Sequence, residues 1–357
     1  MRPIDVYRDK IDKIDDQLLK LINRRAALAV QIGKEKSRQN AKIHFHVPHR
    51  EREIIERLKQ ANTGPFSDET IELVFRELFS ATLALEKPLR ISFLGPEATF
   101  THQASVKHFG HSSTFLSAPN IESIFSDVEN GKSDYGVVPV ENSIEGAVNV
   151  TLDCFAESPL LICDEVNLKI SHYLLSSASD IKSVKTIYSH PQPLGQCRQW
   201  LNRNLPLAAH EITSSTASAA KTVRGKKSVA AIAGKLASDL YGLNILAENL
   251  QDSADNTTRF WVIGKEPAKA AKRNKTSIVF SIKDEAGSLL HTLQLFAKNS
   301  INLSKIQSRP LRNRPWEYLF YVDLEGHQDE ELIGKTLKTL AKKCLFFRIL
   351  GSYPNRG

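Results

Sequence analysis

The sequence predicts a chain of several domains: an all-α helical domain, a two-lobed α/β domain and a small α+β domain of the ferredoxin-like type. Its 357 residues are enough for two or three domains of ordinary size. Apolar residues recur at helical spacing in the first part, short strands alternate with helices in the middle, and the last part reads βαββαβ. We therefore assign residues 1–88, 89–268 and 275–357 to the three domains.

The first domain is expected to contain three helices. Residues 5–38 predict one long amphipathic helix, because they lack proline and repeat apolar residues at steps of three and four. Pro48 precedes a second helical pattern at 49–61, and Ser67 can cap a third helix that ends at Pro88.

The middle and the end of the chain are rich in strand patterns. β-Branched or aromatic runs occur at 90–95, 135–141, 185–191, 228–234 and 258–264. The basic run KAAKRNK at 269–275 falls where a linker between domains is expected. After it, four strand patterns enclose two helices, expected near 287–298 and 329–343.

Composition and charge exclude several classes of protein. No apolar run is long enough for a membrane span and the N-terminus is charged, so we expect neither export nor membrane insertion but a cytoplasmic protein. The net charge of +8 is spread over both ends of the chain, and its one dense basic run lacks aromatic residues, so nucleic acid is not an expected partner. Four isolated cysteines predict reduced, buried thiols and no zinc site.

Three cations on the first helix suggest an anion site. Arg25 and Lys36 are eleven residues apart, so they share a helix face with Cα atoms about 16 Å apart and can close on one small dianion. Arg8 is about 25 Å from Arg25, too far to bind the same small molecule, so it could serve such a site only from another chain. The alternative is that all three are solvated surface charges.

A histidine cluster at His44, His46 and His49 invites a metal interpretation. We prefer surface histidines, because the segment looks like a loop between helices and no acidic or cysteine ligand precedes Glu51. No metal site is predicted.

The motifs RDKID, NRRAALAVQIGKEK, REREIIERL and SATLALE resemble the all-helical chorismate mutase domain, whose family forms intertwined dimers with sites completed across chains. The rearrangement of chorismate to prephenate is pericyclic, so no cofactor, metal or nucleophile is needed. The resemblance implies these contacts: Arg25 and the partner's Arg8 with the two carboxylates, Lys36 and Glu86 with the ether oxygen, Glu51 with the ring hydroxyl, Thr82 with a carboxylate, and Arg50 in support. Val47 departs from the family, which often has Asp or Arg there. A second reading is that this domain only dimerises the chain.

Two segments of the central domain can each begin a helix with hydroxyl side chains. Thr99 or Thr101 can open one helix, and Ser214, Ser215 and Thr216 can open another. Either helix N-terminus could bind a carboxylate or could be an ordinary cap.

Five motifs in fixed order, GPEATFTHQAS, VVPVENSIEGAVN, SHPQPLGQC, SSTASAA and TTRFW, resemble prephenate dehydratase over 90–265. That family is bilobal and binds prephenate in the cleft between the lobes. The resemblance implies that Thr258 acts as the acid that helps the ring hydroxyl leave, with Arg259 and Phe260 in support. It implies a cleft lined by Thr99, Glu141, Asn142, Ser143, Ser189, Gln196, Ser214, Ser215 and Thr216. A non-catalytic solute-binding protein is the alternative, since it would also have two lobes.

The C-terminal pattern resembles an ACT regulatory domain, a small amino-acid sensor. Its expected L-phenylalanine site comprises Gly287, Ser288, Leu289, Leu290, Gln307, Ser308, Arg309 and Pro310. Ser288, Leu290 and Gln307 depart from the usual Gly-Ala-Leu-Val and Glu-Ser-Arg-Pro motifs, and a dimerising domain without a ligand is the alternative. The chain thus resembles bifunctional chorismate mutase/prephenate dehydratases. This implies a cofactor-free homodimer that makes phenylpyruvate and is inhibited by L-phenylalanine.

Overall fold

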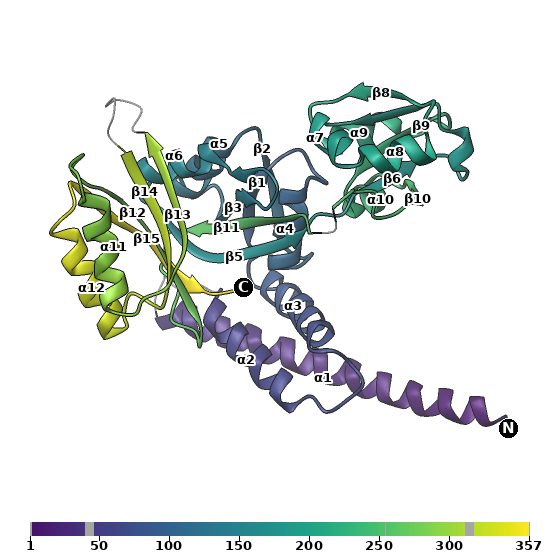
Figure 1. Ribbon diagram of the computed structural model, residues 1–357. Helices are drawn as coiled ribbons and strands as arrows, with labels where there is room; N and C mark the ends of the chain where they lie inside the picture. Colours follow the sequence, from purple (N-terminus) through teal and green to yellow (C-terminus); the bar gives the residue numbers. More distant parts are fainter. Residues whose placement is uncertain (1, 40–45, 254, 311–317, 357) are drawn as a thin grey trace. The chain divides into compact units, whose positions relative to one another are not determined.

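The computed structural model describes residues 2–39, 46–253, 255–310 and 318–356 (Figure 1). The chain divides into two compact units. A helical unit contains Met1–Leu89 and His108–Thr114, and a mixed unit contains Arg90–Lys107 and Phe115–Gly357. Among the described helices, none combines the length and the apolar content that a membrane span requires.

The helical unit contains the three predicted helices, α1 (Pro3–Gln39), α2 (Pro48–Ala61) and α3 (Asp68–Ala84). The predicted cap is present, because the backbone N–H of Thr70 donates to Ser67 Oγ at 3.2 Å. The third helix ends earlier than the predicted boundary at Pro88.

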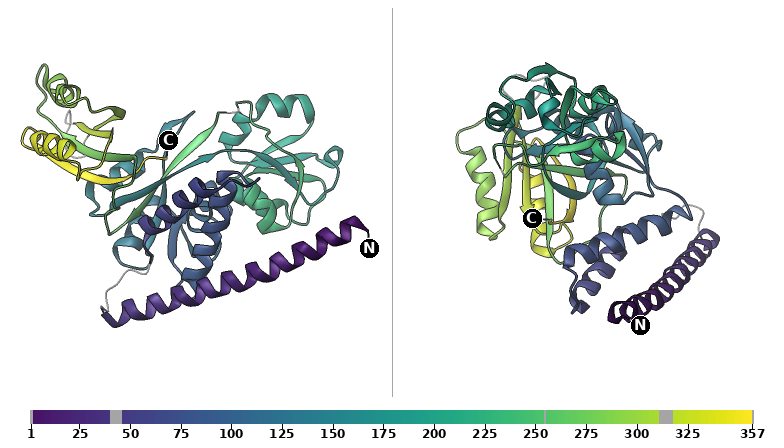
Figure 2. Two further views of the ribbon diagram at one scale, coloured as in Figure 1. Left: turned by 90° about the horizontal axis from the view of Figure 1, so that it is seen from below. Right: turned by 90° about the vertical axis from the view of Figure 1, so that its right-hand side faces the viewer.

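Helix α1 leaves its apolar stripe largely open in the single chain. Figure 2 shows it in purple as one long rod. The exposed apolar residues along it are Ile4, Val6, Tyr7, Ile11, Ile14, Leu18, Leu19, Leu21, Ile22, Leu28 and Ile32. A stripe of this length, exposed to water, is typical of a surface that another protein surface covers.

The first lobe of the mixed unit is built on a sheet with the order β2-β1-β3-β11-β5, in which β4 also pairs with β3. Strands β1 and β3 are parallel, whereas β11 runs antiparallel to both β3 and β5. Helices α5 and α6 pack against β3. The elements are β1 (Arg90–Leu94), α4 (Phe100–Phe109), β2 (Thr114–Ala118), α5 (Ile121–Glu129), β3 (Tyr135–Asn142), β4 (Gly146–Ala147), α6 (Asn149–Glu157), β5 (Leu161–Lys169) and β11 (Thr257–Gly264).

The second lobe has a five-stranded sheet of order β10-β6-β9-β7-β8, with α9 packed against β9 and β7. Its elements are β6 (Tyr173–Ser176), β7 (Thr186–Ser189), α7 (Pro191–Gln196), α8 (Arg198–Asn204), β8 (Ala209–Ile212), α9 (Thr216–Val223), β9 (Val229–Ala233), α10 (Lys235–Tyr241) and β10 (Asn244–Ala247). The chain passes between the lobes twice, at 170–172 and at 248–256. All five predicted strand runs of the middle domain contain a strand, namely β1, β3, β7, β9 and β11, whereas β2, β4, β5, β6, β8 and β10 were not predicted.

The C-terminal part has the predicted βαββαβ order and forms a sheet of order β13-β14-β12-β15. Its elements are β12 (Asn274–Ser281), α11 (Ser288–Lys298), β13 (Leu303–Pro310), β14 (Tyr318–Glu325), α12 (Glu331–Ala341) and β15 (Phe346–Pro354). Helices α11 and α12 cover one face of this sheet (Figure 1). Its other face shares a hydrophobic core with the first lobe, to which Val279 and Tyr321 contribute beside Leu152 and Trp261.

The basic run at 269–275 is only partly a linker. Its last two residues begin β12, and Lys275 is 9% exposed. Lys275 Nζ lies 2.8 Å from Glu165 Oε1, so a carboxylate of the first lobe neutralises the buried ammonium. The run is therefore a structural connection between two sheets, which its composition did not indicate.

Candidate active sites

The first candidate site lies in the helical unit, where three helices bring polar side chains together. Arg25 Nη1 on α1 donates to Thr82 Oγ1 on α3 at 3.2 Å. The guanidinium also lies 4.8 Å from the centroid of the Phe79 ring, within cation–π distance. Burial lowers the pKa of Arg25, and the negative charge of Glu51 on α2 opposes that shift. Arg25, Glu51 and Thr82 therefore lie close together, and their expected contacts with chorismate stay a prediction.

Lys36 and Glu86, which the sequence assigns to the same site, lie close enough to each other to interact electrostatically. Burial raises the pKa of Glu86 above its ordinary value, and the nearby charge of Lys36 offsets this only in part. Gly33 lies three residues before Lys36 on α1. It allows the Glu86 carboxyl to approach the helix backbone, because a Cβ atom at residue 33 would collide with that carboxyl. The local environment therefore extends the pH range over which Glu86 keeps its proton, the form that can donate a hydrogen bond.

Arg8 and Arg50 make contacts within their own helices. Arg8 Nη1 lies 3.8 Å from Asp5 Oδ1, and Arg50 Nη1 donates to Glu53 Oε2 at 3.1 Å. Helix α1 is continuous from Pro3 to Gln39, so the axial separation of Arg8 from Arg25 is about 25 Å. Arg8 cannot reach the Arg25 site of its own chain.

The histidines weighed as metal ligands give no such centre in the described ranges. His44 lies outside the described residues. His46 Nε2 lies 3.7 Å from Glu51 Oε2. Among the residues that the structure describes, no three His, Cys, Asp or Glu side chains cluster as a metal site would require.

The second candidate site centres on Thr258, near the start of β11. The side-chain amide Nδ2 of Asn142 donates to Thr258 Oγ1 at 2.8 Å and to Asn256 Oδ1 at 2.8 Å. Asn142 Oδ1 accepts from the backbone N–H groups of Ile144 and Glu145, which fixes the orientation of the amide. Since Thr258 Oγ1 accepts from Asn142, its own proton is directed elsewhere and is available to a substrate.

Gln196 joins this cluster from α7 in the second lobe. Its Oε1 accepts from Asn256 Nδ2 at 3.1 Å and lies 2.8 Å from His172 Nε2. Because an amide oxygen only accepts, His172 carries its proton on Nε2. Gln196 Nε2 then faces away from both donors, and it is a buried atom with no hydrogen-bond partner in the described structure. This amide is therefore held ready to donate to a ligand.

Sequence reasoning missed His172 and Asn256. Both lie on the two segments that connect the lobes, and both are about 1% exposed. Burial lowers the pKa of His172, opposed by its hydrogen bond to Gln196, so the neutral imidazole is favoured. The Phe100 ring packs edge-on against the His172 ring at 5.6 Å. No motif marked these residues, because their role depends on the meeting of the two lobes.

Several hydroxyls expected to line the cleft brace the backbone. Ser189 is fully buried and its Oγ donates to the Ile232 carbonyl at 2.9 Å. Ser143 Oγ donates to the Asp255 carbonyl at 2.9 Å and accepts from the Thr257 N–H at 3.0 Å. The Ser143 contacts tie the β3 end to the start of β11 and so support the position of Thr258 indirectly.

The two predicted helix openings are helix caps. His102 N donates to Thr99 Oγ1 at 3.3 Å, and Ser218 N donates to Ser215 Oγ at 3.0 Å. Ser214 Oγ lies 3.3 Å from Ser218 Oγ. Thr216 is 8% exposed and is the first residue of α9. These contacts agree with the ordinary capping interpretation and leave ligand contacts to be tested.

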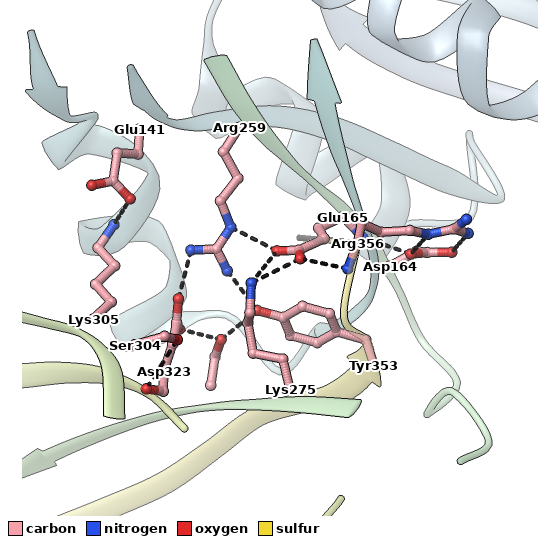
Figure 3. Close-up of polar contacts among 11 residues, drawn as sticks. Glu141, Asp164, Glu165, Arg259, Lys275, Ser304, Lys305, Asp323, Tyr353 and Arg356 are labelled. Atoms are coloured by element: carbon pink, nitrogen blue, oxygen red, sulfur yellow. Dashed lines mark hydrogen bonds and ion pairs between the residues drawn. The ribbon is translucent and has the colours of Figure 1, made fainter. Parts of the chain in front are cut away.

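Glu141 and Arg259 direct their side chains to the C-terminal sheet (Figure 3). Glu141 Oε2 lies 2.7 Å from Lys305 Nζ, and Arg259 bonds to Glu165, Asp323 and Tyr353. These contacts speak against the substrate contacts expected of Glu141 and Arg259. Phe260, also expected to support the site, is 2% exposed and belongs to the core.

The residues expected to bind phenylalanine lie on α11 and β13. Gly287 has φ of +87° immediately before α11, a conformation that favours glycine. Ser288 and Leu289 begin the helix, and Leu290 is 58% exposed. On β13, Gln307 Nε2 lies 3.3 Å from the Ser308 carbonyl.

Arg309 of the same motif is already engaged. Its Nη2 lies 2.7 Å and 2.8 Å from the two carboxylate oxygens of Asp153 in the first lobe. Pro310 follows at the end of β13, which is an edge strand of the sheet. Arg309 thus links the motif to the first lobe of the mixed unit.

Three protein-family models match the chain in the order of the three domains. The model for chorismate mutase type II matches residues 7–87, the model for prephenate dehydratase matches 91–268, and the ACT domain model matches 276–342.

Named relatives match over nearly the whole length. A bifunctional chorismate mutase/prephenate dehydratase of Aquifex aeolicus is 46% identical over 358 residues, covering 99% of this chain and 98% of that protein. The protein of the same description from Stutzerimonas stutzeri is 41% identical, covering 98% and 97%. A crystal structure of prephenate dehydratase in complex with L-Phe from Arthrobacter aurescens is similar with a TM-score of 0.70 and 32% identity, covering 75% of this chain and 90% of that one.

Proposed function

The chain belongs to the family of bifunctional chorismate mutase/prephenate dehydratases, and from this premise we propose how its residues divide the two reactions. The helical unit rearranges chorismate to prephenate. The two-lobed domain removes water and carbon dioxide from prephenate to give phenylpyruvate, and the ACT domain senses L-phenylalanine. The observation that carries the assignment is the Thr258, Asn142 and Gln196 cluster where the lobes meet.

In the mutase site, charged groups hold a compact conformer of chorismate and stabilise the breaking C–O bond. Arg25 binds one carboxylate with help from Thr82. Lys36 and protonated Glu86 donate to the ether oxygen, where negative charge develops. Glu51 accepts from the ring hydroxyl. The raised pKa of Glu86 supports this role, because only the protonated acid can donate.

A homodimer completes the mutase site in this proposal. The exposed apolar stripe of α1 is the surface that a second copy would cover. Arg8 of the partner subunit would bind the second carboxylate, since Arg8 of the same chain is too far away. Arg50, which pairs with Glu53, supports the site from α2. Sedimentation velocity tests the dimer, and a monomer at micromolar concentration would contradict it.

In the dehydratase site, Thr258 helps the hydroxyl of prephenate to leave. The electron pair of the breaking bond to the carboxylate moves into the ring, the C–O bond breaks, and the departing oxygen takes up a proton and leaves as water. Asn142 donates to Thr258 Oγ1, which directs the threonine proton to that oxygen and makes it a better donor. The neutral amide of Asn142 thus activates Thr258 in two ways: it orients the threonine hydroxyl, and it donates a hydrogen bond to the threonine oxygen.

Gln196 positions prephenate through its free amide N–H groups. His172 and Asn256 both donate to Gln196 Oε1 and thereby prevent the amide from turning over. A carboxylate or keto oxygen of prephenate can accept from the amide nitrogen. His172 and Asn256 are therefore positioning residues, which act on substrate through Gln196.

Regulation by L-phenylalanine is assigned to the ACT domain, through the Gly287–Leu290 and Gln307–Pro310 motifs of paired domains. The related enzyme of Arthrobacter aurescens, solved in complex with L-Phe, supports this assignment. A cytoplasmic location completes the proposal, supported by the four cysteines, which form no disulfide bond in the part of the chain that the structure describes. Cys197 is buried, whereas Cys154, Cys163 and Cys344 are only partly so.

A coupled assay tests the whole proposal. The full-length protein, given chorismate, should form prephenate and then phenylpyruvate, and L-phenylalanine should inhibit the second step. Conversion of prephenate without conversion of chorismate would leave the helical unit as a dimerising domain. Binding of prephenate without turnover would instead favour a solute-binding protein.

A further inference from the structure

Strands β3 and β11 carry Asn142 and Thr258 on one face. On the other face they contact the C-terminal sheet of β12 to β15, which we call the ACT sheet. In the antiparallel register of β3 and β11, Thr258 is opposite Asn142, and Arg259 is opposite Glu141. Successive residues of a strand point to opposite faces. Asn142 and Thr258 therefore share one face, whereas Glu141 and Arg259 share the other, which faces the ACT sheet (Figure 3).

Arg259 holds its strand to the ACT sheet through a buried array of charges. Its Nε donates to Glu165 Oε2 at 2.7 Å, its Nη1 to Asp323 Oδ2 at 2.5 Å, and its Nη2 to Tyr353 Oη at 2.8 Å. Lys275 Nζ also binds Glu165, so two cations balance two carboxylates. Burial by itself would lower the pKa of Arg259, but these neighbours raise it, so the guanidinium stays charged. Such a fully paired array fixes the position of β11.

Glu141 makes a more open contact with the ACT sheet. Its carboxylate lies 2.7 Å from Lys305 Nζ on β13, where the Lys305 side chain is 11% exposed and the Glu141 side chain 39%. Lys305 is two residues before Gln307 on the same strand, so both point to the same side. A strand that carries part of the expected phenylalanine site is thereby bonded to a residue adjacent to Asn142.

We propose that the Lys305–Glu141 ion pair transmits the state of the ACT domain to Asn142 and Thr258. The inference rests on the proposed function and deepens it, because it assigns the route by which L-phenylalanine inhibits the dehydratase. It also replaces the substrate contacts expected of Glu141 and Arg259 by contacts between domains.

The geometry gives the physical reason. Arg259 bonds to three partners, so β11 stays in place. Glu141 has one partner in the ACT sheet, Lys305, and its side chain is partly exposed. A movement of β13 on binding L-phenylalanine would pull Glu141 and turn the next residue, Asn142. The hydrogen bond from Asn142 to Thr258 would then lengthen, and the threonine hydroxyl would no longer be oriented to donate its proton to the leaving oxygen. L-Phenylalanine must bind more tightly to that arrangement than to the active one for this to occur.

The test is Lys305→Met in the full-length protein, which removes the charge and nearly keeps the side-chain volume. We expect kcat and KM for prephenate without L-phenylalanine within about threefold of wild type, and calorimetry should show L-phenylalanine binding of similar affinity. At saturating L-phenylalanine, the residual dehydratase activity should be at least about fivefold higher than that of wild type. Lys305→Arg keeps the cation and should retain normal inhibition, and Lys338→Met, an exposed lysine on α12, is the matched control.

The outcomes separate this inference from the proposed function. Full inhibition of Lys305→Met, or the same loss of inhibition in Lys338→Met, would overturn the route. Loss of L-phenylalanine binding in Lys305→Met would also overturn it, because Lys305 would then belong to the ligand site or to the fold. A wild-type protein that does not dehydrate prephenate, or that L-phenylalanine does not inhibit, would instead contradict the proposed function itself.

Discussion

The two candidate active sites differ in the kind of polar group that they use. The candidate mutase site in the helical unit is charged, with Arg25 interacting with Glu51 and Lys36 interacting with Glu86. The dehydratase site is a chain of neutral groups, in which amides orient the Thr258 hydroxyl. A rearrangement that needs only a held conformer and charge stabilisation uses fixed cations, whereas loss of a hydroxyl needs a directed proton.

The two sites also differ in what completes them. The mutase helices leave a long apolar stripe and Arg8 exposed, and in our proposal that site depends on a second copy of the chain. The hydrogen bonds of the dehydratase cluster all join residues of one chain, at the place where the lobes meet. Its catalytic strands are backed by the ACT sheet. The proposed mutase site should therefore respond to dimer formation, and the dehydratase site to the positions of the two lobes and the ACT domain.

The largest effect is expected from removing a mutase cation. Arg25→Ala and Arg8→Ala should each lower mutase kcat/KM on the order of 1,000-fold, because a substrate carboxylate loses its charge-assisted partner. Mixed dimers of the two variants would contain one site with both wild-type arginines and should regain up to about half of the activity. Purified mixed dimers without recovery would refute the shared site, and unchanged dehydratase activity is the control for folding.

The hydroxyl of Thr258 is the corresponding test of the neutral site. Thr258→Val keeps the branched shape but removes the proton donor, so dehydratase kcat should fall roughly 100-fold. Mutase activity should be unchanged in the same preparation. Steady-state kinetics with prephenate measure the effect. A decrease in dehydratase kcat of less than about threefold would show that Thr258 is not the proton donor.

His172 tests whether orientation of a neutral amide matters. His172→Phe keeps a ring beside Phe100 but removes the donor to Gln196, so the amide can turn over. Loss of one hydrogen bond predicts about a tenfold decrease in dehydratase kcat/KM. The decrease should appear mainly in KM if Gln196 binds substrate as strongly in the ground state as in the transition state. Equal activity of variant and wild type would show that Gln196 needs no such support.

The smallest effect concerns the titration of Glu86. Its raised pKa keeps the donor form present to higher pH, and mutase kcat/KM should fall as pH rises through that pKa, because the ionised carboxylate cannot donate. Glu86→Gln donates without titrating, so it should stay within about tenfold of wild type and flatten the alkaline side of the profile. Measurements from about pH 5 to 9 decide this, and an unchanged pH dependence would exclude Glu86 as the titrating donor.

Much of the fold was predictable because its signals are local. The apolar spacing of α1, the Ser67 cap of α3 and the alternating patterns of β12 to β15 are each encoded within a few neighbouring residues. The ordered motifs identified the domains, and Thr258 with Asn142 came from those motifs. In the mutase site, the helical period by itself placed Arg25 and Lys36 on one face and Arg8 out of reach.

The tertiary structure decided which face of each strand meets which neighbour. Glu141 and Arg259 belong to motifs that contain site residues, yet their side chains point to the ACT sheet, because alternation along a strand reverses the face at every residue. His172 and Asn256 became part of the site only where the two connections between the lobes meet. The sequence placed Lys275 in a linker, whereas in the structure it forms an ion pair with Glu165 on β5, a strand distant in the sequence. These contacts join residues far apart in the sequence, and local patterns carry no record of such pairings.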